Sequence, residues 1–328
     1  MRSSRWVTVE ATSLKTILEK LGLHGDLAPT AIAEGRVFVN RRRASSIDSH
    51  VPAETEVTLH AQRPTVELPS PFVLYQERGW IVVNKPAGIP TIADLQGTQG
   101  TLADEVARAT GVSLNALHPT SRLDRGVSGV VIFATHAGAR DELRHARERG
   151  HYTRRYVAIA QGTLAQREAS WTWSIARDRN PMLRRAVSAP TDDARNPDIH
   201  PARSRARVIH EWTGSSGGFS ILALAPETGR THQLRVHASR AGVPLLGDES
   251  YGGLRRWTSS TGAAYSATRI ALHCARVALD RLPTPPASMH FEAPIPVELL
   301  TMAMQLGLAE SLARQLLQEA AVCSLELG

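Results

Sequence analysis

The sequence predicts an α+β protein with two domains. Its 328 residues suggest two folding units, taking roughly 150 residues per domain as a prior. Strand-length runs rich in β-branched residues recur along most of the chain, and a few helical segments separate them. A proline-containing stretch without periodicity divides the chain near its start. We therefore expect an N-terminal α/β domain at 1–62, a linker at 63–71, a main domain at 72–296 and a C-terminal helical extension at 297–328.

The composition is that of a soluble globular protein. Hydrophobic residues make up 42% and charged residues 21% of the chain, and no apolar run of about 18 residues occurs. The first residues lack the apolar core of a signal peptide, so we expect a cytoplasmic protein. Cys274 and Cys323 show no pairing pattern, and His232 and His237 have no third ligand nearby. We expect neither a metal site nor a cofactor.

The charge indicates the class of partner. The net charge is +7, and the 38 basic residues are almost all arginine, with lysine only at Lys15, Lys20 and Lys85. Guanidinium groups bind phosphate and stack on bases, so a polyanion is favoured, most simply a nucleic acid. A codon bias toward arginine accounts for the ratio of arginine to lysine but not for the positive excess.

The N-terminal part reads as a small basic module. Helical spacing at 12–23 and 28–34 is followed by a short strand, a basic turn and a second strand at 57–60. This order resembles the alpha-L RNA-binding motif, in which a helix pair and a basic turn hold the RNA backbone. A solvated basic hairpin is the alternative. The residues expected to contact phosphate without base specificity are Arg36, Arg41, Arg42 and Arg43.

The main domain alternates strands with two helices. A hairpin is expected at 72–84 and helices at 101–109 and 136–149, the second with a basic face that we take as solvated. A long mobile loop is expected at 178–201, and a single amphipathic helix at 297–317 for packing or dimerisation. Further strands are expected at 130–134, 153–160, 168–175, 205–212, 219–224 and 270–279.

One carboxylate stands out ahead of a buried strand. Asp124 lies between Arg122 and Arg125, and a glycine-containing turn leads from it into the apolar run 130–134. A scaffold often holds active residues on such a loop. Taken alone, the pattern is equally consistent with a surface ion-pair turn.

A second polar cluster occurs at 226–237. Thr228 or Thr231 can cap a helix, and His232 and Arg235 then project near one another. Backbone amides at a helix start also bind anions, so Arg230 and its neighbours favour a functional site over a plain surface helix.

Together these stretches resemble the RluA-type pseudouridine synthases, from about residue 71 to 296. The family's Asn-Lys-Pro-Ala-Gly stands at 84–88, its Arg-Leu-Asp signature at 122–124, and its Lys-x-Tyr-x-Ala strand at 154–158 with arginine for lysine. The Thr-Gly-Arg-Thr-His-Gln-Leu-Arg-Val-His block and the Gly-Asp and Tyr-Gly that follow are intact from 228 to 252. The Leu-His-Ala strand corresponds to 272–274. The resemblance implies a pseudouridine synthase fold with a mixed, largely antiparallel central sheet flanked by helices.

The signature loop departs from the family pattern at three positions. Ser121 replaces the usual histidine, Gly126 an acidic residue and Val127 a threonine. All three positions flank Asp124. None of the three replacements removes a group that takes part in the reaction of the family.

The resemblance also implies roles for individual residues. Asp124 would start the isomerisation of uridine, Arg235 would be its counter-ion and Tyr156 would stack on the uracil and assist removal of the carbon-five proton. Arg122 would fill the gap left by the flipped uridine. The substrate would be structured ribosomal or transfer RNA, and we expect a monomer. Other expected substrate or RNA contacts are Lys85, Arg154, Arg230 and His232.

Two other functions remain open at this stage. A non-catalytic RNA-binding protein is suggested by Ser121, Gly126 and Val127. The retained Asp124, Tyr156 and Arg235 oppose it. An N-glycosylase that releases the base would use the same acid.

Overall fold

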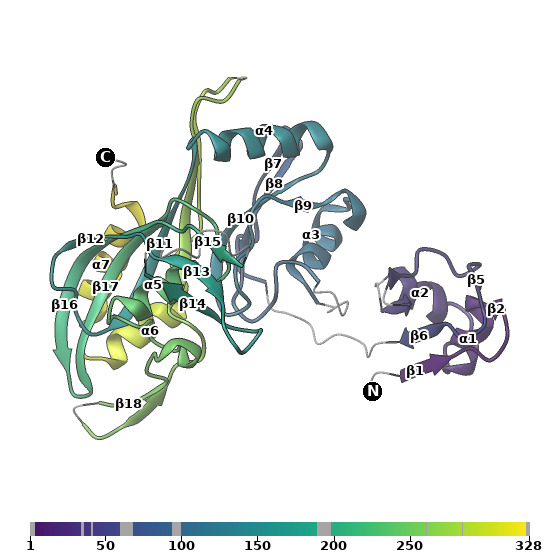
Figure 1. Ribbon diagram of the computed structural model, residues 1–328, viewed down its shortest axis with the longest axis horizontal. Coiled ribbons are helices and arrows are strands. Elements are labelled where there is room, and N and C mark those ends of the chain that lie inside the picture. Colours follow the sequence, from purple (N-terminus) through teal and green to yellow (C-terminus); the bar gives the residue numbers. More distant parts are fainter. Residues whose placement is uncertain are drawn as a thin grey trace. The chain divides into compact units, whose positions relative to one another are not determined.

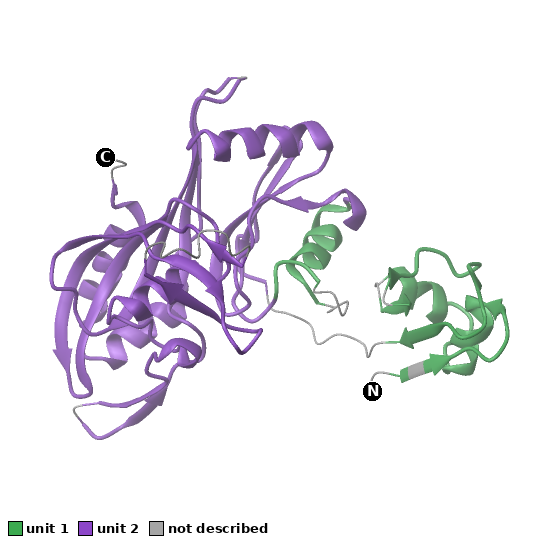
Figure 2. Cartoon of the chain, in the orientation of Figure 1, with its two compact units in different colours: residues 1–67, 90–111 green, residues 68–89, 112–328 purple. Residues whose placement is uncertain are grey.

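A computed structural model describes residues 4–33, 36–40, 42–59, 68–93, 100–188, 198–259, 261–283 and 285–325. The chain divides into two compact units, Met1–Glu67 with Pro90–Gly111, and Leu68–Ile89 with Val112–Gly328 (Figure 2). None of the helices within the described residues is long and apolar enough to cross a membrane.

The first unit is a small α/β module. Leu14, Ile17 and Leu18 of its first helix are fully or almost fully buried against the strands, and Ser13 caps that helix by accepting a hydrogen bond from the Thr16 amide. The two short helices and two strands expected from the sequence are present. Its helices are α1 (Leu14–Lys20), α2 (Leu27–Ala33) and α3 (Leu102–Thr110). Its main sheet runs in the order β1 (Ser4–Val7), β6 (Glu56–Leu59), β3 (Val37–Val39) and β4 (Arg42–Arg43), and β2 (Thr12–Ser13) pairs with β5 (His50–Val51).

The expected basic residues of this module differ in their surroundings. Arg36 is only 8% exposed, whereas Arg42 is exposed. Arg43 donates a 2.7 Å hydrogen bond to Asp104 within the same unit. Arg41 lies outside the described residues. Of the three described arginines, Arg42 is therefore the most exposed.

The second unit is built on one large sheet, which is mixed and largely antiparallel as expected. All its strand pairs are antiparallel except β10 with β20, where Ser128 is opposite His273 and Gly129 opposite Cys274. The order is β12 (Glu168–Trp171), β16 (Ser204–Gly214), β17 (Gly217–Pro226), β11 (Tyr152–Gln161), β20 (Leu272–Leu279), β10 (Ser128–Ala134), β8 (Trp80–Lys85) and β7 (Val73–Glu77). β21 (Met289–Glu292) pairs with β20, and β9 (His118–Pro119) with β10.

Two expectations for 168–201 are wrong. The single strand expected at 168–175 is two strands in different sheets, because the chain leaves the central sheet after Trp171 and re-pairs from Ser174. The described part of the expected loop 178–201 contains strands. These belong to a small sheet of β14 (Arg184–Val187), β13 (Ser174–Arg177) and β15 (Ile199–His200), and a separate hairpin joins β18 (Arg256–Thr258) to β19 (Ala264–Ser266).

The C-terminal segment belongs to the core of the second unit. The single helix expected at 297–317 is two helices, α6 (Val297–Gln305) and α7 (Glu310–Val322), separated at Gly307 with φ +107°. They lie against β16 and β17 (Figure 1) and share a hydrophobic cluster with Val157 and Ile159 of β11. Packing, one of the two roles expected for this segment, is therefore confirmed.

The side chains of β11 alternate between the two faces of the central sheet. Because successive strand side chains point to opposite faces, Tyr156 lies on the face opposite the one covered by α6 and α7. The remaining helices of the unit are α4 (Ala137–Glu148) and α5 (Gln233–Arg240), with 3₁₀ turns η1 (Leu114–Ala116) and η2 (Glu249–Tyr251).

The buried position of α7 gives a stability prediction. Leu317 is fully buried, whereas Leu312 of the same helix is 38% exposed. Leu317→Ala should lower the free energy of unfolding by about 2–5 kcal/mol through lost burial and a cavity, and Leu312→Ala by less than about 1 kcal/mol. Urea unfolding followed by circular dichroism measures both. Equal effects would show that α7 is not part of the core.

Candidate active site

Asp124 lies on the loop between β9 and β10, and its side chain is 24% exposed. Oδ2 accepts a 3.0 Å hydrogen bond from Nη1 of Arg235, 111 residues further along the chain. Among the described residues, Oδ1 has no hydrogen-bond partner. The carboxylate therefore has one oxygen fixed by a cation and one free to face a substrate.

A second carboxylate orients Arg235. Nε and Nη2 of Arg235 donate to the two oxygens of Asp248 at 2.7 and 2.8 Å, which is the bidentate geometry that locks a guanidinium plane. Asp248 is 1% exposed, and the guanidinium carbon lies 4.9 Å from the ring centre of Tyr251. Burial alone would lower the pKa of Arg235, but Asp248 and then Asp124 raise it above its ordinary value. Arg235 is a permanent cation held against Asp124.

His232 completes the surroundings of the acid. It begins α5 in the left-handed conformation with φ 58°, so neither Thr228 nor Thr231 is the helix cap that we expected. Its Nε2 lies 3.9 Å from Oδ2 of Asp124, and its Nδ1 is 2.7 Å from the hydroxyl of Tyr251. Burial lowers the pKa of His232, so the neutral imidazole is favoured near pH 7.

Lys85 fixes the backbone of the Asp124 loop. This lysine at the end of β8 is 0% exposed, and its ammonium donates to the carbonyls of Val127 at 2.7 Å and of Asp124 at 3.2 Å. It also reaches the carbonyls of Pro86 and Arg125. Burial, followed by the positive charge of Arg269, lowers the pKa of Lys85 to about 7. We had expected Lys85 to contact RNA, but its position inside the protein makes it a positioning residue instead.

The glycine at the start of β10 allows the loop to approach the sheet closely. Gly129 has φ +117°, and a Cβ at this position would collide with the backbone carbonyl of Cys274 on β20. The next turn upstream is also tight, since a Cβ at Gly126 would lie 3.0 Å from Cδ1 of Ile270. An acidic side chain at 126 would therefore need Ile270 to move, which gives a packing context for this departure from the family pattern.

The other expected residues are placed unequally. Arg122 is exposed beside the acid, and Arg154 is 8% exposed and donates to the carbonyl of Thr228 at 2.7 Å. Tyr156 is 4% exposed, and burial raises its pKa well above the usual value, so its hydroxyl stays protonated. No hydrogen bond joins Tyr156 to Asp124 among the described residues. The structure thus brings together Asp124, His232 and Arg235.

Sequence reasoning assigned no role to Asp248 or Tyr251. Both stand in the Gly-Asp and Tyr-Gly that follow the block at 228–237, which resembles the family pattern, so a signal was present. The sequence motif does not show which residues Asp248 and Tyr251 contact, because only the fold brings the 244–252 turn against the start of α5. Ser121 is buried and lies 3.5 Å from the hydroxyl of Tyr152, which supplies a polar partner at the position where the family has histidine.

Comparison with solved structures identifies the fold. Human RNA Pseudouridylate Synthase Domain Containing 1 superimposes with a TM-score of 0.54 at 21% sequence identity, covering 78% of this chain and 98% of the human chain. The fold is that of the pseudouridylate synthases, as the sequence predicted.

Sequence relatives identify the family. The family model for RNA pseudouridylate synthase matches residues 79–240. The uncharacterized RNA pseudouridine synthase YjbO of Bacillus subtilis is 32% identical over 231 residues, which are 69% of this chain and 73% of YjbO. Ribosomal large subunit pseudouridine synthase D of Neisseria meningitidis serogroup A is 30% identical over 304 residues, 87% of this chain and 76% of the relative. The chain belongs to the RNA pseudouridylate synthase family, and it is an isomerase that converts uridine to pseudouridine in RNA.

Removing the ammonium of Lys85 should loosen the Asp124 loop. Lys85→Met leaves buried carbonyls without a donor and should lower the free energy of unfolding by about 2–4 kcal/mol. Because the loop carries Asp124, kcat should fall by about tenfold or more. Lys15→Met, at an exposed position, is the control and should change neither value. Urea unfolding and single-turnover kinetics measure the two effects.

The pH dependence provides a second readout for Lys85. The pKa is about 7 in the folded state and near 10.5 in the unfolded state, so the unfolded state binds more protons between these values. Stability of the parent should therefore rise relative to Lys85→Met as the pH increases from about 7 toward 10.5. A difference that does not vary with pH would contradict the burial of this ammonium.

Proposed function

We propose that this pseudouridine synthase acts on uridines of ribosomal RNA and that Asp124 is its catalytic carboxylate. The observation that supports the role of Asp124 is its asymmetric environment. One oxygen is held at 3.0 Å by Arg235, which Asp248 orients in turn, and the other oxygen has no partner among the described residues. An ionised, positioned carboxylate with an open oxygen is what the first step requires.

The reaction breaks the bond from N1 of uracil to the anomeric carbon and forms a bond from carbon five to the same carbon. The carbon-five proton then leaves and N1 gains a proton, so the product is an isomer of the substrate. Asp124 either attacks the anomeric carbon, as the nucleophile of a retaining glycosidase does, or removes the neighbouring sugar proton to give a glycal. Both routes use the carboxylate in its charged form, and the guanidinium of Arg235 lies 3.0 Å from Oδ2.

Tyr156 and Arg122 take complementary parts in this proposal. The phenol of Tyr156 is protonated because burial raises its pKa, so a stacking role on the uracil is favoured over direct removal of a proton by a phenolate. Arg122 is exposed next to Asp124 and can enter the space that the flipped uridine leaves in the RNA. That contact offsets an unstacking cost of a few kcal/mol.

The choice of ribosomal RNA rests on relatives that match nearly the whole chain. The Neisseria meningitidis enzyme, which covers 87% of this chain, is named for the large ribosomal subunit. An N-terminal module with the alpha-L pattern and an exposed Arg42 would add sequence-independent phosphate contacts. A net charge of +7 is consistent with such a substrate.

Asp124→Asn tests the catalytic assignment. The substitution keeps the shape of the side chain but removes its charge, so pseudouridine formation should fall by at least about a thousandfold while RNA binding changes by less than about twofold. Asp141→Asn is the matched control, since Asp141 lies on α4 with a side chain 46% exposed, and it should retain full activity. Unmodified large-subunit ribosomal RNA is the substrate, and chemical mapping of pseudouridine is the measurement.

Each other outcome has a clear meaning. Normal pseudouridine formation by Asp124→Asn would remove Asp124 from the reaction. Release of free uracil by the parent protein would indicate an N-glycosylase, and binding without any conversion of ribosomal or transfer RNA would indicate a non-catalytic RNA-binding protein. Conversion of transfer RNA alone would correct the substrate and leave Asp124 in place.

A further inference from the structure

Three arginines from separate elements meet beside the Asp124 site. Arg147 at the end of α4 donates from Nη1 to the carbonyl of Thr120 at 2.9 Å. Arg154 of β11 donates from Nη2 to the carbonyl of Thr228 at 2.7 Å. Arg230 stands in the turn between β17 and α5, and its Nε donates to the carbonyl of Pro201 at 3.0 Å. We call Arg147, Arg154 and Arg230 the arginine cluster.

Gly229 shows how closely two of these side chains approach. A Cβ at residue 229 would collide with Nη2 of Arg147 and would lie 3.6 Å from Nη2 of Arg154. Both guanidinium groups therefore face the same point of the backbone, and the glycine leaves room for them. Since the two residues come from α4 and β11, the fold rather than local sequence creates this approach.

No carboxylate neutralises the cluster within the part of the chain that the structure describes. None of the three arginines forms an ion pair there, although many other arginines do, including Arg144 with Asp141 and Glu148. Arg154 is 8% exposed, and its Nε is buried without a hydrogen-bond partner. A buried donor without an acceptor is costly, so the cluster has unused capacity to bind an anion.

The electrostatics support the same reading. Burial, and next the positive charge of Arg154, lowers the pKa of Arg147, and Arg230 adds to the effect. Repulsion among the positive charges of Arg147, Arg154 and Arg230 destabilises the free protein, and a bound anion would reduce it. Arginine forks match the geometry of phosphate oxygens, so a phosphate group is the anion that fits.

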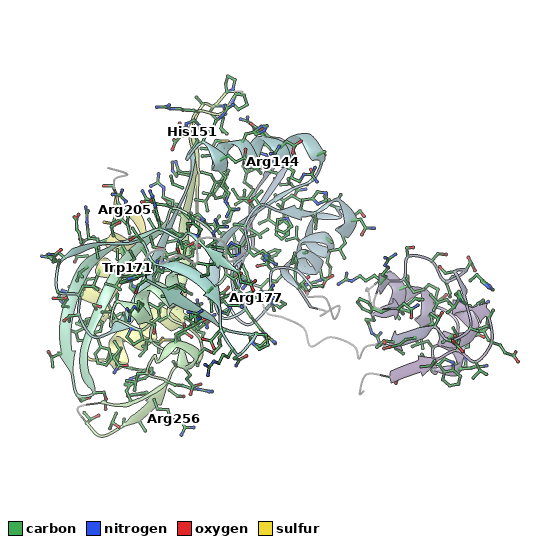
Figure 3. The ribbon with its side chains drawn as sticks, viewed as in Figure 1. Arg144, His151, Trp171, Arg177, Arg205 and Arg256 are labelled. Carbon is green, nitrogen blue, oxygen red and sulfur yellow. The ribbon has the colours of Figure 1, made fainter. Side chains whose placement is uncertain are left out.

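The residues of the cluster, or the residues that they contact, lie close in the sequence to those of the proposed active site. Thr120 opens the loop that carries Asp124, and Arg230 precedes His232 in the turn that starts α5. Arg154 stands two residues before Tyr156 on β11, so both side chains point to the same face of the sheet. Basic side chains are also spread over the rest of this unit, as Arg144, Arg177, Arg205 and Arg256 show in Figure 3. Three of these four, Arg144, Arg177 and Arg205, form ion pairs with carboxylates. The arginine cluster differs from this basic surface because its side chains converge and form no ion pair among the described residues.

We propose that the arginine cluster binds one backbone phosphate of the RNA strand next to the target uridine, with Arg147 as a determinant of substrate affinity. This inference rests on the proposed function, since it assumes that the uridine is presented to Asp124. In this proposal the cluster holds the RNA backbone beside the flipped nucleotide. It takes no part in breaking or forming bonds, so its loss should raise KM and leave kcat nearly unchanged.

The test compares variants of matched charge on one helix. Arg147→Gln removes a cluster charge, and Arg144→Gln removes the charge of a neighbouring arginine that is already ion-paired. The RNA is large-subunit ribosomal RNA transcribed in vitro, and KM and kcat are measured for pseudouridine formation. Arg147→Gln should raise KM about tenfold with kcat within about twofold of the parent, and Arg144→Gln should change KM less than about twofold.

Binding at several salt concentrations supplies a readout that a merely structural role would not move. In the Asp124→Asn background, which prevents turnover, each lost phosphate contact lowers the slope of log K against log salt by about 0.7–0.9. Arg147→Gln should lose about one contact, and Arg144→Gln none. Gly229→Ala keeps every charge but displaces the guanidinium of Arg147, so it should reproduce the loss of slope.

The results separate this inference from the proposed function. If Arg147→Gln and the parent share the same slope and KM, or if Arg144→Gln changes them equally, the cluster is not a phosphate site. If the parent makes no pseudouridine in this RNA but Arg147→Gln still lowers the slope, the substrate assignment fails and the cluster stands. If inorganic phosphate raises the melting temperature of the parent but not of Arg147→Gln while RNA binding is unchanged, the ligand is free phosphate and the RNA assignment is overturned.

Discussion

The guanidinium of Arg235 between two carboxylates is the interaction on which the site depends. Asp248 is almost fully buried, and Arg235 donates a hydrogen bond to each of its two oxygens. The remaining Nη1 is then aimed at Asp124 at 3.0 Å. One cation thereby joins three segments: the Asp124 loop, which is 111 residues away in the sequence, α5, and the turn that carries Asp248. Removing Asp248 would leave Arg235 with Asp124 as its remaining carboxylate partner among the described residues.

A second interaction, made by the buried ammonium of Lys85, connects the central sheet to the Asp124 loop. Four backbone carbonyls surround it, three of them from the Asp124 loop. The lysine fixes where the loop backbone runs, and Arg235 fixes where the Asp124 side chain points. Precise placement of a reactive group in this way is what converts binding energy into rate. Arg122, two residues before Asp124, is by contrast exposed.

Most elements of the fold could be predicted from the sequence, because their patterns are local. The β-branched run 130–134 and the helical spacing at 136–149 correspond to β10 and α4. The break between Trp171 and Ser174 could not, since the alternation of side chains continues while the strand changes sheets. The division of 297–317 into two helices had a signal in Gly307, which adopts a positive φ that ends α6.

The site was predictable only in part, for a physical reason. Spacing alone does not show that Asp124 and Arg235 touch across 111 residues, and the pairing was expected only through the family resemblance. The basic face of α4 was interpreted as solvated, yet Arg147 turns toward Thr120 and Gly229, which no helical pattern reveals. Lys85 is an isolated lysine in the sequence, and its charge suggests contact with RNA. Its burial instead places the ammonium against backbone carbonyls of the Asp124 loop.

The most direct test of this account is a double-mutant cycle between Arg235 and Asp248, read as kcat/KM under single-turnover conditions. Asp248 acts on the reaction only by orienting Arg235, so Asp248→Asn alone should reduce kcat/KM by about a hundredfold. In the Arg235→Gln background the same substitution should cause less than about a threefold further loss, because nothing remains to be oriented. Equal losses in both backgrounds would contradict the claim that Asp248 works through Arg235 on Asp124.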